Sequence, residues 1–539
     1  MPSGIVPAAA PIELHNPSTP LRPLELEREL ASHPDRGFVG QLIHNLVHGC
    51  RIGYDGPQFA HIAPHLPSAY AYSTVVDSAI AKECQANRMA GPYPYPPLPN
   101  LRCSGLGVVP KKDGSWRLIY HLSAPHGSSI NDFIDPESYS LSYCTIDDAI
   151  AIVTKLGPGT LMGKIDLKNA FRLCPVSKED WPLLGIYWRG NYYIDKCLPF
   201  GLRSAPYLFN LLASGLEWIL IHNYGLEWLL HYLDDLFTAG PPGTNICHRN
   251  MCCMLSLCSH VNAPVKPEKV EGPSTLITFL GILLDTVAMQ ASITLERKAE
   301  IVQALSELRG KHTCTKKQLL SLIGKLAFAC KVVPPGRIFL RRLIDLSTTV
   351  GPIHHHITIN QEARRDIQWW IDFLPEWPGA SLFREPHWST AYDMELYTDA
   401  SDKGYGAYWS GKWFNSTWTS WQSQHPIAWR EMFAVIVACS TWGSHWKRKQ
   451  VLFHCDNAAV VDIWRHGSCK SPNMMQLVRL LYSLAARGNY NVGIAHIPGV
   501  DNILADHLSR FSMQAFRAAA PEAEQPPCPF TIPANLTQH

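Results

Sequence analysis

The chain has 539 residues and a formal net charge of +2; 46% of its residues are hydrophobic and 17% are charged. This composition is typical of a globular protein with several domains, and it excludes a largely disordered chain. The small net charge excludes a uniformly basic protein, so any nucleic-acid-binding surface has to be local. We find no apolar run of membrane-spanning length and no signal peptide, so we expect a cytoplasmic or nuclear protein that is not secreted.

The 16 cysteines are scattered along the sequence without Cys-X-X-Cys spacing. Four of them crowd one predicted helix beside two histidines: Cys247, Cys252, Cys253 and Cys258, with His248 and His260. A zinc site is one interpretation of this group. Buried thiols in a reducing compartment explain it more simply.

The sequence begins with a segment rich in Pro and Ala, and we treat residues 1–90 as an N-terminal extension. Residues 91–99 contain five prolines and cannot form a helix, so they mark the entrance to the next domain. We assign that domain, a set of strands and helices, to residues 91–285.

A β-hairpin is predicted around Asp113-Gly114, because two β-rich runs flank this turn signal. Lys111, Lys112 and Arg117 crowd its tip. They indicate either an ordinary solvated basic turn or a finger that grips a triphosphate, since Arg can contact phosphate through two nitrogens.

Two weaker signals follow in the same domain. Asp166 lies in a strand-like segment, and the aromatic residue Phe171 follows five positions later. Residues 198–206 form a loop bounded by Gly and Pro, with Phe200 and Gly201 inside it, that opens an apolar helix. Glycine loops and helix N-termini let the backbone approach a nucleotide closely. A plain core phenylalanine remains the simpler interpretation of Phe171.

The most informative stretch is His231-Tyr232-Leu233-Asp234-Asp235-Leu236-Phe237. Two adjacent carboxylates between apolar runs predict a tight hairpin joining two half-buried strands. Burying two like charges is costly, so water or a metal ion must take up their charge. The stretch is either a solvated Asp-Asp turn or the metal-binding hairpin of a template-directed polymerase.

Residues 286–350 differ from the preceding domain in charge and pattern, and they predict a basic helical module. Between residues 290 and 345 there are eleven Lys and Arg against four Asp and Glu, a difference of seven positive charges. The module could follow a phosphate backbone, or it could be an ordinary solvated helix face. We treat residues 351–390 as a connector, in which His354, His355 and His356 are expected at the surface.

Residues 391–512 predict a second domain in which acids fall at the ends of strands and helices. The four acids are Asp399, Glu431, Asp456 and Asp506. Their order in a β-then-α pattern indicates one two-metal site at the edge of a mixed sheet. Each acid alone would be better explained as a helix cap or a surface residue. Residues 513–539 are rich in Ala, Pro and Glu and predict a disordered tail.

Taken in order, these segments resemble a reverse transcriptase polyprotein. Asp166, Asp234 and Asp235 match the metal aspartates of its polymerase site. The substrate-binding residues that the resemblance implies are Lys111, Lys112, Arg117, Phe171, Phe200, Gly201 and Tyr232. Among them Phe171 would be the steric gate near the sugar 2′ position. Lys269 falls where the family has a lysine proposed to protonate the leaving pyrophosphate, and residues 279–285 resemble the primer grip.

The second domain resembles a retroelement ribonuclease H, with Asp399, Glu431, Asp456 and Asp506 as its metal-binding acids and His496 as its mobile histidine. The resemblance implies an α+β multidomain fold, a right-hand polymerase (fingers, palm, thumb) followed by a ribonuclease H-like mixed α/β domain. It implies two-metal catalysis with Mg²⁺, for which Mn²⁺ can substitute. The implied partners are an RNA template, a DNA primer, RNA/DNA hybrid and dNTPs, without a membrane.

Several short segments resemble DIRS-type, tyrosine-recombinase retrotransposons most, with gypsy-type elements second. These segments are Gly107–Lys112, His121–Ser123, Ser129–Asp132 and Asp506–Arg510. No protease motif, zinc-finger integrase module or recombinase is expected within the sequence. A domesticated, catalytically silent nucleic-acid-binding remnant, or a structural subunit, is the alternative function.

Overall fold

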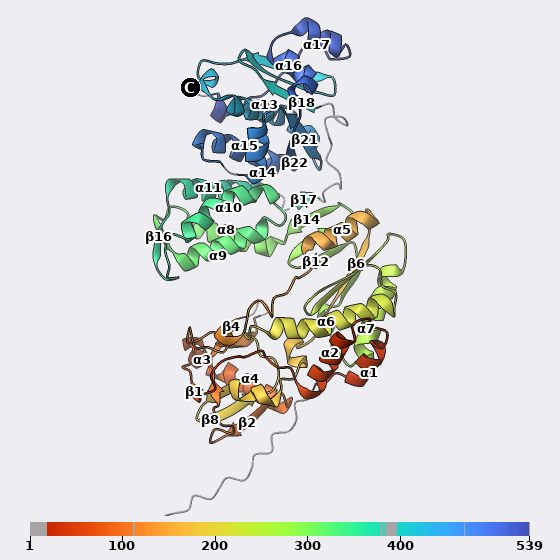
Figure 1. Ribbon diagram of the computed structural model, residues 1–539, viewed down its shortest axis with the longest axis vertical. Helices are drawn as coiled ribbons and strands as arrows, with labels where there is room; N and C mark the ends of the chain where they lie inside the picture. The colour runs from red at the N-terminus through yellow and green to blue at the C-terminus, as the bar shows by residue number, and fades with distance from the viewer. Residues whose placement is uncertain (1–18, 111–113, 378–379, 383–395, 468, 538–539) are drawn as a thin grey trace, which may run out of the picture. The chain divides into compact units, whose positions relative to one another are not determined.

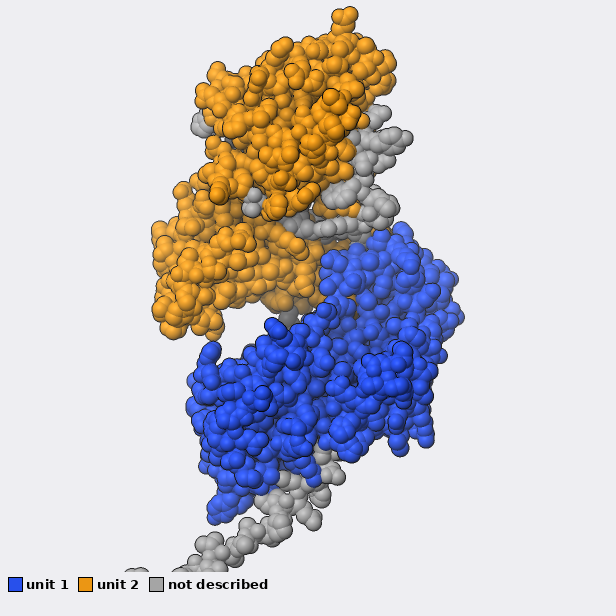
Figure 2. Space-filling model, in the orientation of Figure 1, with its two compact units in different colours: residues 1–277 blue, residues 278–539 orange. Residues whose placement is uncertain are grey.

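The computed structural model describes residues 19–110, 114–377, 380–382, 396–467 and 469–537, and Figure 1 labels many of their elements. Two compact units make up the chain, residues 1–277 and residues 278–539 (Figure 2). Both units combine helices with sheets, as the predicted α+β class requires. Over the described residues, no helix is long and apolar enough to cross a membrane.

Seven α-helices belong to the described part of the first unit: α1 (Pro23–Glu29), α2 (Arg36–His48), α3 (Pro67–Ala71), α4 (Ser73–Gln85), α5 (Ile146–Leu156), α6 (Ala205–His222) and α7 (Ile246–His260). Leu26 of α1, Leu42 of α2 and Leu216 of α6 are buried in one core. Gly215 permits the close approach of α2 to α6, because a Cβ there would lie 2.9 Å from Leu42 Cδ2. Residues of α1 and α2 therefore belong to the main core of the first unit.

The described strands of the first unit fall into three sheets. Their bounds are β1 (His61–Ile62), β2 (Met89–Tyr93), β3 (Arg102–Cys103), β4 (Leu106–Pro110), β5 (Trp116–Tyr120), β6 (Leu161–Asp166), β7 (Gly185–Trp188), β8 (Asn191–Asp195), β9 (Leu229–Tyr232), β10 (Asp235–Gly240) and β11 (Glu271–Ser274). One sheet has the order β1-β3-β7-β8-β2. The hairpin β4–β5 packs its Leu106 in a second core with Val76 and Ile80 of α4.

The central sheet of the first unit has the order β11-β6-β10-β9. Helix α7 packs on β6 and β10, and α6 packs on β9. Strands β9 and β10 form an antiparallel hairpin whose turn holds Leu233 and Asp234, and Leu233 adopts a left-handed φ of 52°. The predicted Asp-Asp hairpin is therefore confirmed, and it lies beside β6 in the sheet.

The second unit begins with a sheet and a helical module. The sheet has the order β12-β13-β14-β17, with β12 (Leu276–Phe279), β13 (Ile282–Asp285), β14 (Gln290–Ile293) and β17 (Ala380–Leu382). The helices are α8 (Leu295–Leu308), α9 (Lys316–Ala329), α10 (Ile338–Ser347) and α11 (Gln361–Glu376), and β15 (Thr313–Thr315) pairs with β16 (His356–Thr358). Thr315 and Gln318 form a capping box at the start of α9. Helix α11 packs on α8 and α10, so the predicted connector contributes to the same helical module.

A five-stranded mixed sheet forms the rest of the second unit, in the order β20-β19-β18-β21-β22. Its elements are β18 (Leu396–Ala400), β19 (Gly404–Trp409), β20 (Lys412–Thr417), α13 (Ile427–Trp442), β21 (Gln450–Cys455), α14 (Ala458–His466), α15 (Pro472–Gly488), β22 (Asn491–His496) and α16 (Ile503–Ser509). Strands β18 to β20 are antiparallel, whereas β21 and β22 run parallel to β18. This arrangement matches the predicted ribonuclease H-like mixed domain.

The C-terminal residues fold onto this domain. Helix α17 (Met513–Ala519) places Phe516 in a core with Tyr408 and Trp413. Trp413 Nε1 then donates to the Glu524 carbonyl at 2.7 Å, and the Cys528 N–H donates to the Trp413 carbonyl at 2.7 Å. The prediction of a disordered tail is therefore wrong for residues 513–537: the apolar Phe516 and the backbone groups of this segment find partners along β20.

Candidate active sites

The first candidate site lies where three strands of the central sheet meet. Asp166 is the last residue of β6, and Asp235 is the first residue of β10. The register pairs Asp166 directly with Asp235. The Leu167 N–H donates to the Asp234 carbonyl at 2.8 Å, which holds the hairpin turn against the end of β6. The structure therefore brings together the three acids that the sequence separates by almost seventy positions.

Two lysines contact these acids. Lys269 Nζ lies 2.6 Å from Asp166 Oδ2, whereas Lys266 Nζ contacts Asp166 Oδ1 and lies 3.9 Å from Asp234 Oδ2. The Lys266 N–H also donates to the Asp166 carbonyl at 2.9 Å. Sequence reasoning identified Lys269 and missed Lys266. The sequence signal that could have identified Lys266 is its position three residues before Lys269, on the same short turn.

Burial and mutual repulsion shift the pKa values of the acids in this site. Burial, followed by the nearby Asp234 and Asp166 carboxylates, raises the pKa of Asp235 to about 6. Burial and the Asp166 carboxylate also raise the pKa of Asp234. The hydrogen bond to Asp166 raises the pKa of Lys269. Carboxylates this close together favour a bound cation, because a cation relieves their repulsion.

Aromatic residues extend from this site toward the β4–β5 hairpin. The Phe171 ring is half-buried and lies 5.4 Å from the Phe200 ring and 5.7 Å from the Phe209 ring, between centroids. The exposed Arg117 guanidinium lies 5.1 Å from the Phe200 centroid. Residues Lys111 and Lys112 lie outside the described residues. The structure thus connects Arg117, Phe200 and Phe171 in one row.

Backbone contacts hold the loop that carries Phe200. Gly201 has a φ of 105°, and a Cβ there would lie 2.6 Å from the Tyr120 carbonyl oxygen, so this position requires glycine. Asn131 Nδ2 donates to the Gly201 carbonyl at 2.8 Å. Tyr232, the remaining candidate, ends β9 with its ring 5.0 Å from the Tyr143 ring.

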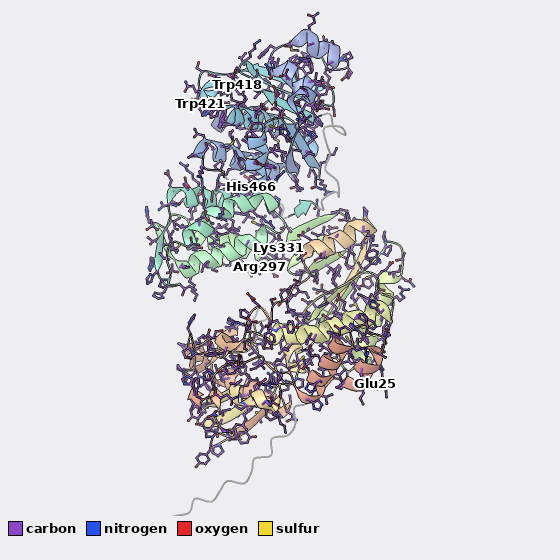
Figure 3. The ribbon with its side chains drawn as sticks, viewed as in Figure 1. Glu25, Arg297, Lys331, Trp418, Trp421 and His466 are labelled. Atoms are coloured by element: carbon purple, nitrogen blue, oxygen red, sulfur yellow. The ribbon has the colours of Figure 1, made fainter. Side chains whose placement is uncertain are left out.

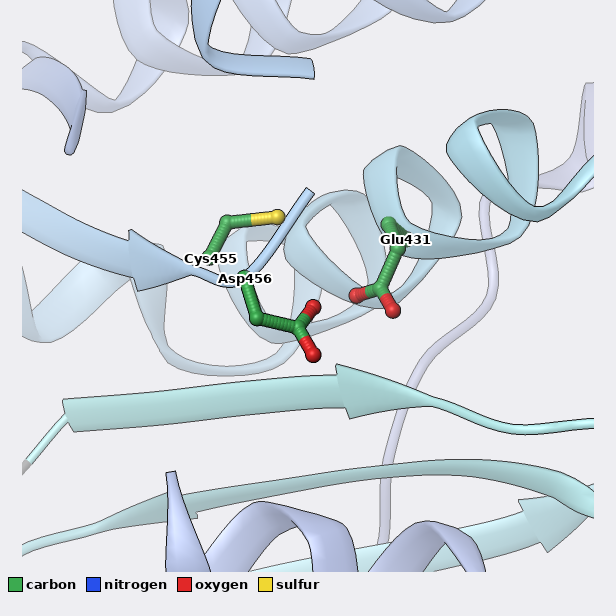
Figure 4. A group of neighbouring side chains, drawn as sticks. All are labelled: Glu431, Cys455 and Asp456. Atoms are coloured by element: carbon green, nitrogen blue, oxygen red, sulfur yellow. The ribbon is translucent and has the colours of Figure 1, made fainter. Parts of the chain in front are cut away.

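The second candidate site is built at one edge of the ribonuclease H-like sheet. Asp399 lies in β18, Asp456 follows β21, and Glu431 lies in α13. Figure 4 shows Glu431 and Asp456 facing each other, with Cys455 beside them. A cavity of about 630 Å³ is lined by Asp399, Glu431 and Asp456. The fourth acid, Asp506 on α16, pairs with Arg510 at 2.5 Å, and Arg510 also lines this cavity.

Burial is the largest cause of the raised pKa values in this second site. It raises the pKa of Asp399 to about 6, with smaller increases from Asp456 and Asp506. It also raises the pKa of Glu431, again with Asp399 and Asp456 adding to the effect. Among the described residues, Glu431 Oε2 has no hydrogen-bond partner although it is buried. An oxygen left without a partner inside an acidic pocket fits a cation site.

One further residue supports these acids. Ser509, which is fully buried at the end of α16, donates its hydroxyl hydrogen to Asp399 Oδ2 at 2.5 Å. Sequence reasoning selected Asp506 and quoted the Asp506–Arg510 segment for its family resemblance, but it gave Ser509 no role. His496 is exposed at the end of β22, and the register pairs it with Cys455, the residue before Asp456. The structure therefore places all five predicted residues of this domain at the same end of the sheet.

The cysteine-rich helix shows no comparable grouping. Burial raises the pKa of Cys247 to about 11 and that of Cys258 to about 12. Cys252 Sγ lies 3.6 Å from His248 Nε2, on the exposed side of α7. Over the described part of the chain, the one group of three side chains arranged to hold a metal ion is that of Glu431, Cys455 and Asp456. Cys247 and Cys258 of α7 are therefore buried thiols, whereas Cys252 is exposed and Cys253 is half-buried.

Comparisons with known proteins bear on the first site. Residues 109–284 match the family model described as Reverse transcriptase (RNA-dependent DNA polymerase). The chain is 21% identical over 421 residues to the Transposon Tf2-3 polyprotein of Schizosaccharomyces pombe, a match that covers 75% of this chain and 28% of that protein. It is 20% identical over 423 residues to Polyprotein P3 of Commelina yellow mottle virus, covering 74% of this chain and 20% of that protein. The chain thus spans about a quarter of the length of these curated relatives.

Among solved structures, a foamy viral protease-reverse transcriptase in complex with double-stranded DNA aligns with a TM-score of 0.49 and 16% identity, covering 91% of this chain and 84% of that one. The predicted order of domains is confirmed: the segment that matches the reverse transcriptase family precedes a ribonuclease H-like mixed α/β domain. Asp166, Asp234 and Asp235 all fall inside the matched segment. Residues 109–284 of this chain therefore form a reverse transcriptase domain.

Proposed function

We propose that this chain is an RNA-directed DNA polymerase that copies retroelement RNA into DNA and also cleaves the RNA strand of RNA/DNA hybrids. The observation that carries the proposal is the pairing of Asp166 with Asp235 at the edge of the central sheet, inside the segment that matches the reverse transcriptase family. A second, independent acid cluster in the ribonuclease H-like domain supports the cleavage activity.

Both acid clusters fit divalent metal ions. Asp166, Asp234 and Asp235 would hold them in the first site, and Asp399, Glu431, Asp456 and Asp506 in the second. All these ligands are carboxylate oxygens, which favour Mg²⁺ and accept Mn²⁺. The Cys455 thiol beside Asp456 has a raised pKa because it is buried, so it stays protonated and is not a ligand that Mg²⁺ prefers. The chemistry supplied by ions bound there would be activation of the attacking oxygen and neutralisation of phosphate charge.

In the polymerase site the surrounding residues would bind and orient the nucleotide. Arg117, exposed on the β4–β5 hairpin, would contact the triphosphate. Lys269 is protonated beside Asp166 and can donate a proton to the leaving pyrophosphate. Phe171 would lie under the sugar and exclude a 2′-hydroxyl. Lys266, which contacts Asp166 and approaches Asp234, adds a second positive charge that helps to balance the three acids.

In the ribonuclease site, the domain must distinguish RNA from DNA through the 2′-hydroxyl of the cleaved strand. His496 is exposed beside the acids and could assist release of the product. The partners proposed for the chain are an RNA template, a DNA primer, an RNA/DNA hybrid and dNTPs. Foamy viral protease-reverse transcriptase has been solved in complex with an RNA/DNA hybrid. Within retroelements, the short motifs quoted above favour a DIRS-type origin over a gypsy-type one.

The direct test is primer extension by the full chain on poly(rA)/oligo(dT) with Mg²⁺, together with cleavage of a labelled RNA/DNA hybrid. We expect both activities, and we expect EDTA to abolish both. Hybrid binding without either activity, across Mg²⁺ and Mn²⁺ concentrations, would instead support the silent remnant.

A further inference from the structure

A basic cleft lies inside the second unit, where the helical module faces the ribonuclease H-like domain. Its volume is about 790 Å³. Arg337 and Arg341 come from the start of α10, and Arg465 and His466 come from the end of α14. The single acid among the lining residues, Asp345, is paired with Arg341 at 3.0 Å. The cleft is therefore positively charged, and Arg341 keeps 72% of its side chain exposed.

The floor of this cleft is a pair of stacked aromatic rings. Trp464 and Tyr482 lie 4.3 Å apart between centroids, with 23° between their planes. Trp464 is 8% exposed, and its Nε1–H donates to the Val492 carbonyl at 3.1 Å. Figure 3 labels His466, which follows this tryptophan on α14. The stack fixes the end of α14, so Arg465 and His466 project from a rigid base.

The two walls of the cleft are joined behind it by a buried ionic contact. Asp366 of α11 forms an ion pair with Arg479 of α15 and lies 3.7 Å from Arg342 of α10. Arg479 also donates to the Ile338 carbonyl at 3.2 Å. Within the helical module, the Phe339 ring of α10 stacks on the Trp369 ring of α11, with 3.8 Å between the ring centroids. The spacing between the arginines of α10 and the residues of α14 is therefore preset.

We propose that this cleft is a binding site for the phosphate backbone of a nucleic-acid duplex, and that it holds the RNA/DNA hybrid against the second unit. This inference rests on the proposed function. Guanidinium groups bind phosphates through paired hydrogen bonds, and several in one rigid groove suit a repeating polyanion. Two of its arginines, Arg337 and Arg341, belong to the segment 290–345, which carries an excess of seven positive charges. Several cations contributed by two separate helices suit a repeating polyanion better than a short acidic peptide.

The test is the salt dependence of hybrid binding, measured by fluorescence anisotropy with the full chain and a labelled RNA/DNA hybrid in EDTA. We expect Arg337→Ala, Arg341→Ala and Arg465→Ala together to weaken binding about tenfold or more, and to flatten the slope of log affinity against log salt by about one unit per guanidinium. Replacing the same three residues with Lys should keep most of the slope, because the charge remains.

Asp345→Asn provides a matched variant with the opposite expectation. It frees Arg341 without disturbing the floor of the cleft, so binding should become tighter and the slope steeper. An unchanged affinity and slope in the triple Ala variant would overturn the cleft while leaving the proposed function intact. If the triple Ala variant lost binding to a polyglutamate peptide but kept its binding to the hybrid, the cleft would also be excluded as a nucleic-acid site, with the proposed function left intact. Failure of the unaltered chain to bind any hybrid would contradict both proposals.

Discussion

Asp166 is the residue on which the first site depends, because it touches two lysine ammonium groups and pairs with Asp235. The acids of this site could be predicted from sequence, since Asp166 ends a strand, Asp235 starts one, and Asp234 lies in the turn just before it. Lys266 was missed, because its position three residues before Lys269 does not by itself show that the turn returns the chain to Asp166 at the end of β6. Ser509 was missed for the same reason: its partner, Asp399, lies 110 positions away in the sequence.

Phe171 carries the first prediction at this scale. If its ring excludes the 2′-hydroxyl, Phe171→Val should raise the kcat/KM for GTP about tenfold or more, with a modest loss for dGTP. Phe209→Val is the control, since that ring is buried against Phe171. It should cost about 1–4 kcal/mol of stability and leave the GTP to dGTP ratio unchanged. A ratio that stays the same in Phe171→Val would show that this ring is only part of the core.

Ser509 carries the second prediction. Its hydroxyl donates to a buried, crowded carboxylate, and a hydrogen bond to a charged group contributes about 1.5–3 kcal/mol. Ser509→Ala should therefore lower hybrid cleavage about tenfold and raise the Mg²⁺ concentration needed for it, with DNA synthesis unaffected. Titration calorimetry with Mn²⁺ should show weaker binding to the second site. A drop in melting temperature with an unchanged metal dependence would mean that Ser509 serves folding alone.

At the scale of elements, the hairpin β9–β10 and the basic helices followed from periodicity and turn signals, and both are present. The C-terminal segment did not follow. The composition of residues 513–537 resembles a disordered tail, yet Phe516 finds an apolar site between Tyr408 and Trp413. Helices α1 and α2 complete a core made mostly of later residues. Composition gives the polarity of a segment, but it does not show whether a distant part of the chain offers an apolar surface against which the segment can pack.

The contact between α11 and α15 gives a prediction about stability. Burial raises the pKa of Asp366 to about 6 even though Arg479 and Arg342 lower it, so ionised Asp366 depends on these partners. Arg479→Met should lower the free energy of unfolding by about 3–5 kcal/mol at pH 8. The loss should be smaller at pH 5, because Asp366 takes up a proton as the pH falls through 6 and no longer needs a partner.

Urea unfolding at the two pH values measures this effect. The double variant Asp366→Leu with Arg479→Met should recover most of the lost stability, since it removes the buried charge along with its partner. Equal losses at pH 5 and pH 8, or a double variant no more stable than the single one, would argue against a charge-dependent contact.

At the scale of the whole molecule, two acid clusters lie in separate units, one within residues 1–277 and one within residues 278–539. The order of the two clusters along the chain could be predicted, because short sequence motifs mark each cluster and can be found without knowledge of the fold. The basic cleft was not predictable, since its cations come from two modules more than a hundred residues apart. On the proposed function, these two acid clusters on one chain would act on the same nucleic acid.

The most direct measurement compares Asp234→Asn and Asp456→Asn in the full chain, assayed in parallel for primer extension and for hybrid cleavage. Asp234→Asn should abolish DNA synthesis and leave hybrid cleavage near its original rate, because its carboxylate belongs to the first cluster alone. Asp456→Asn should do the reverse. Circular dichroism would establish that both variants stay folded. If either single change in a folded protein removed both activities, the account of two independent sites would be contradicted.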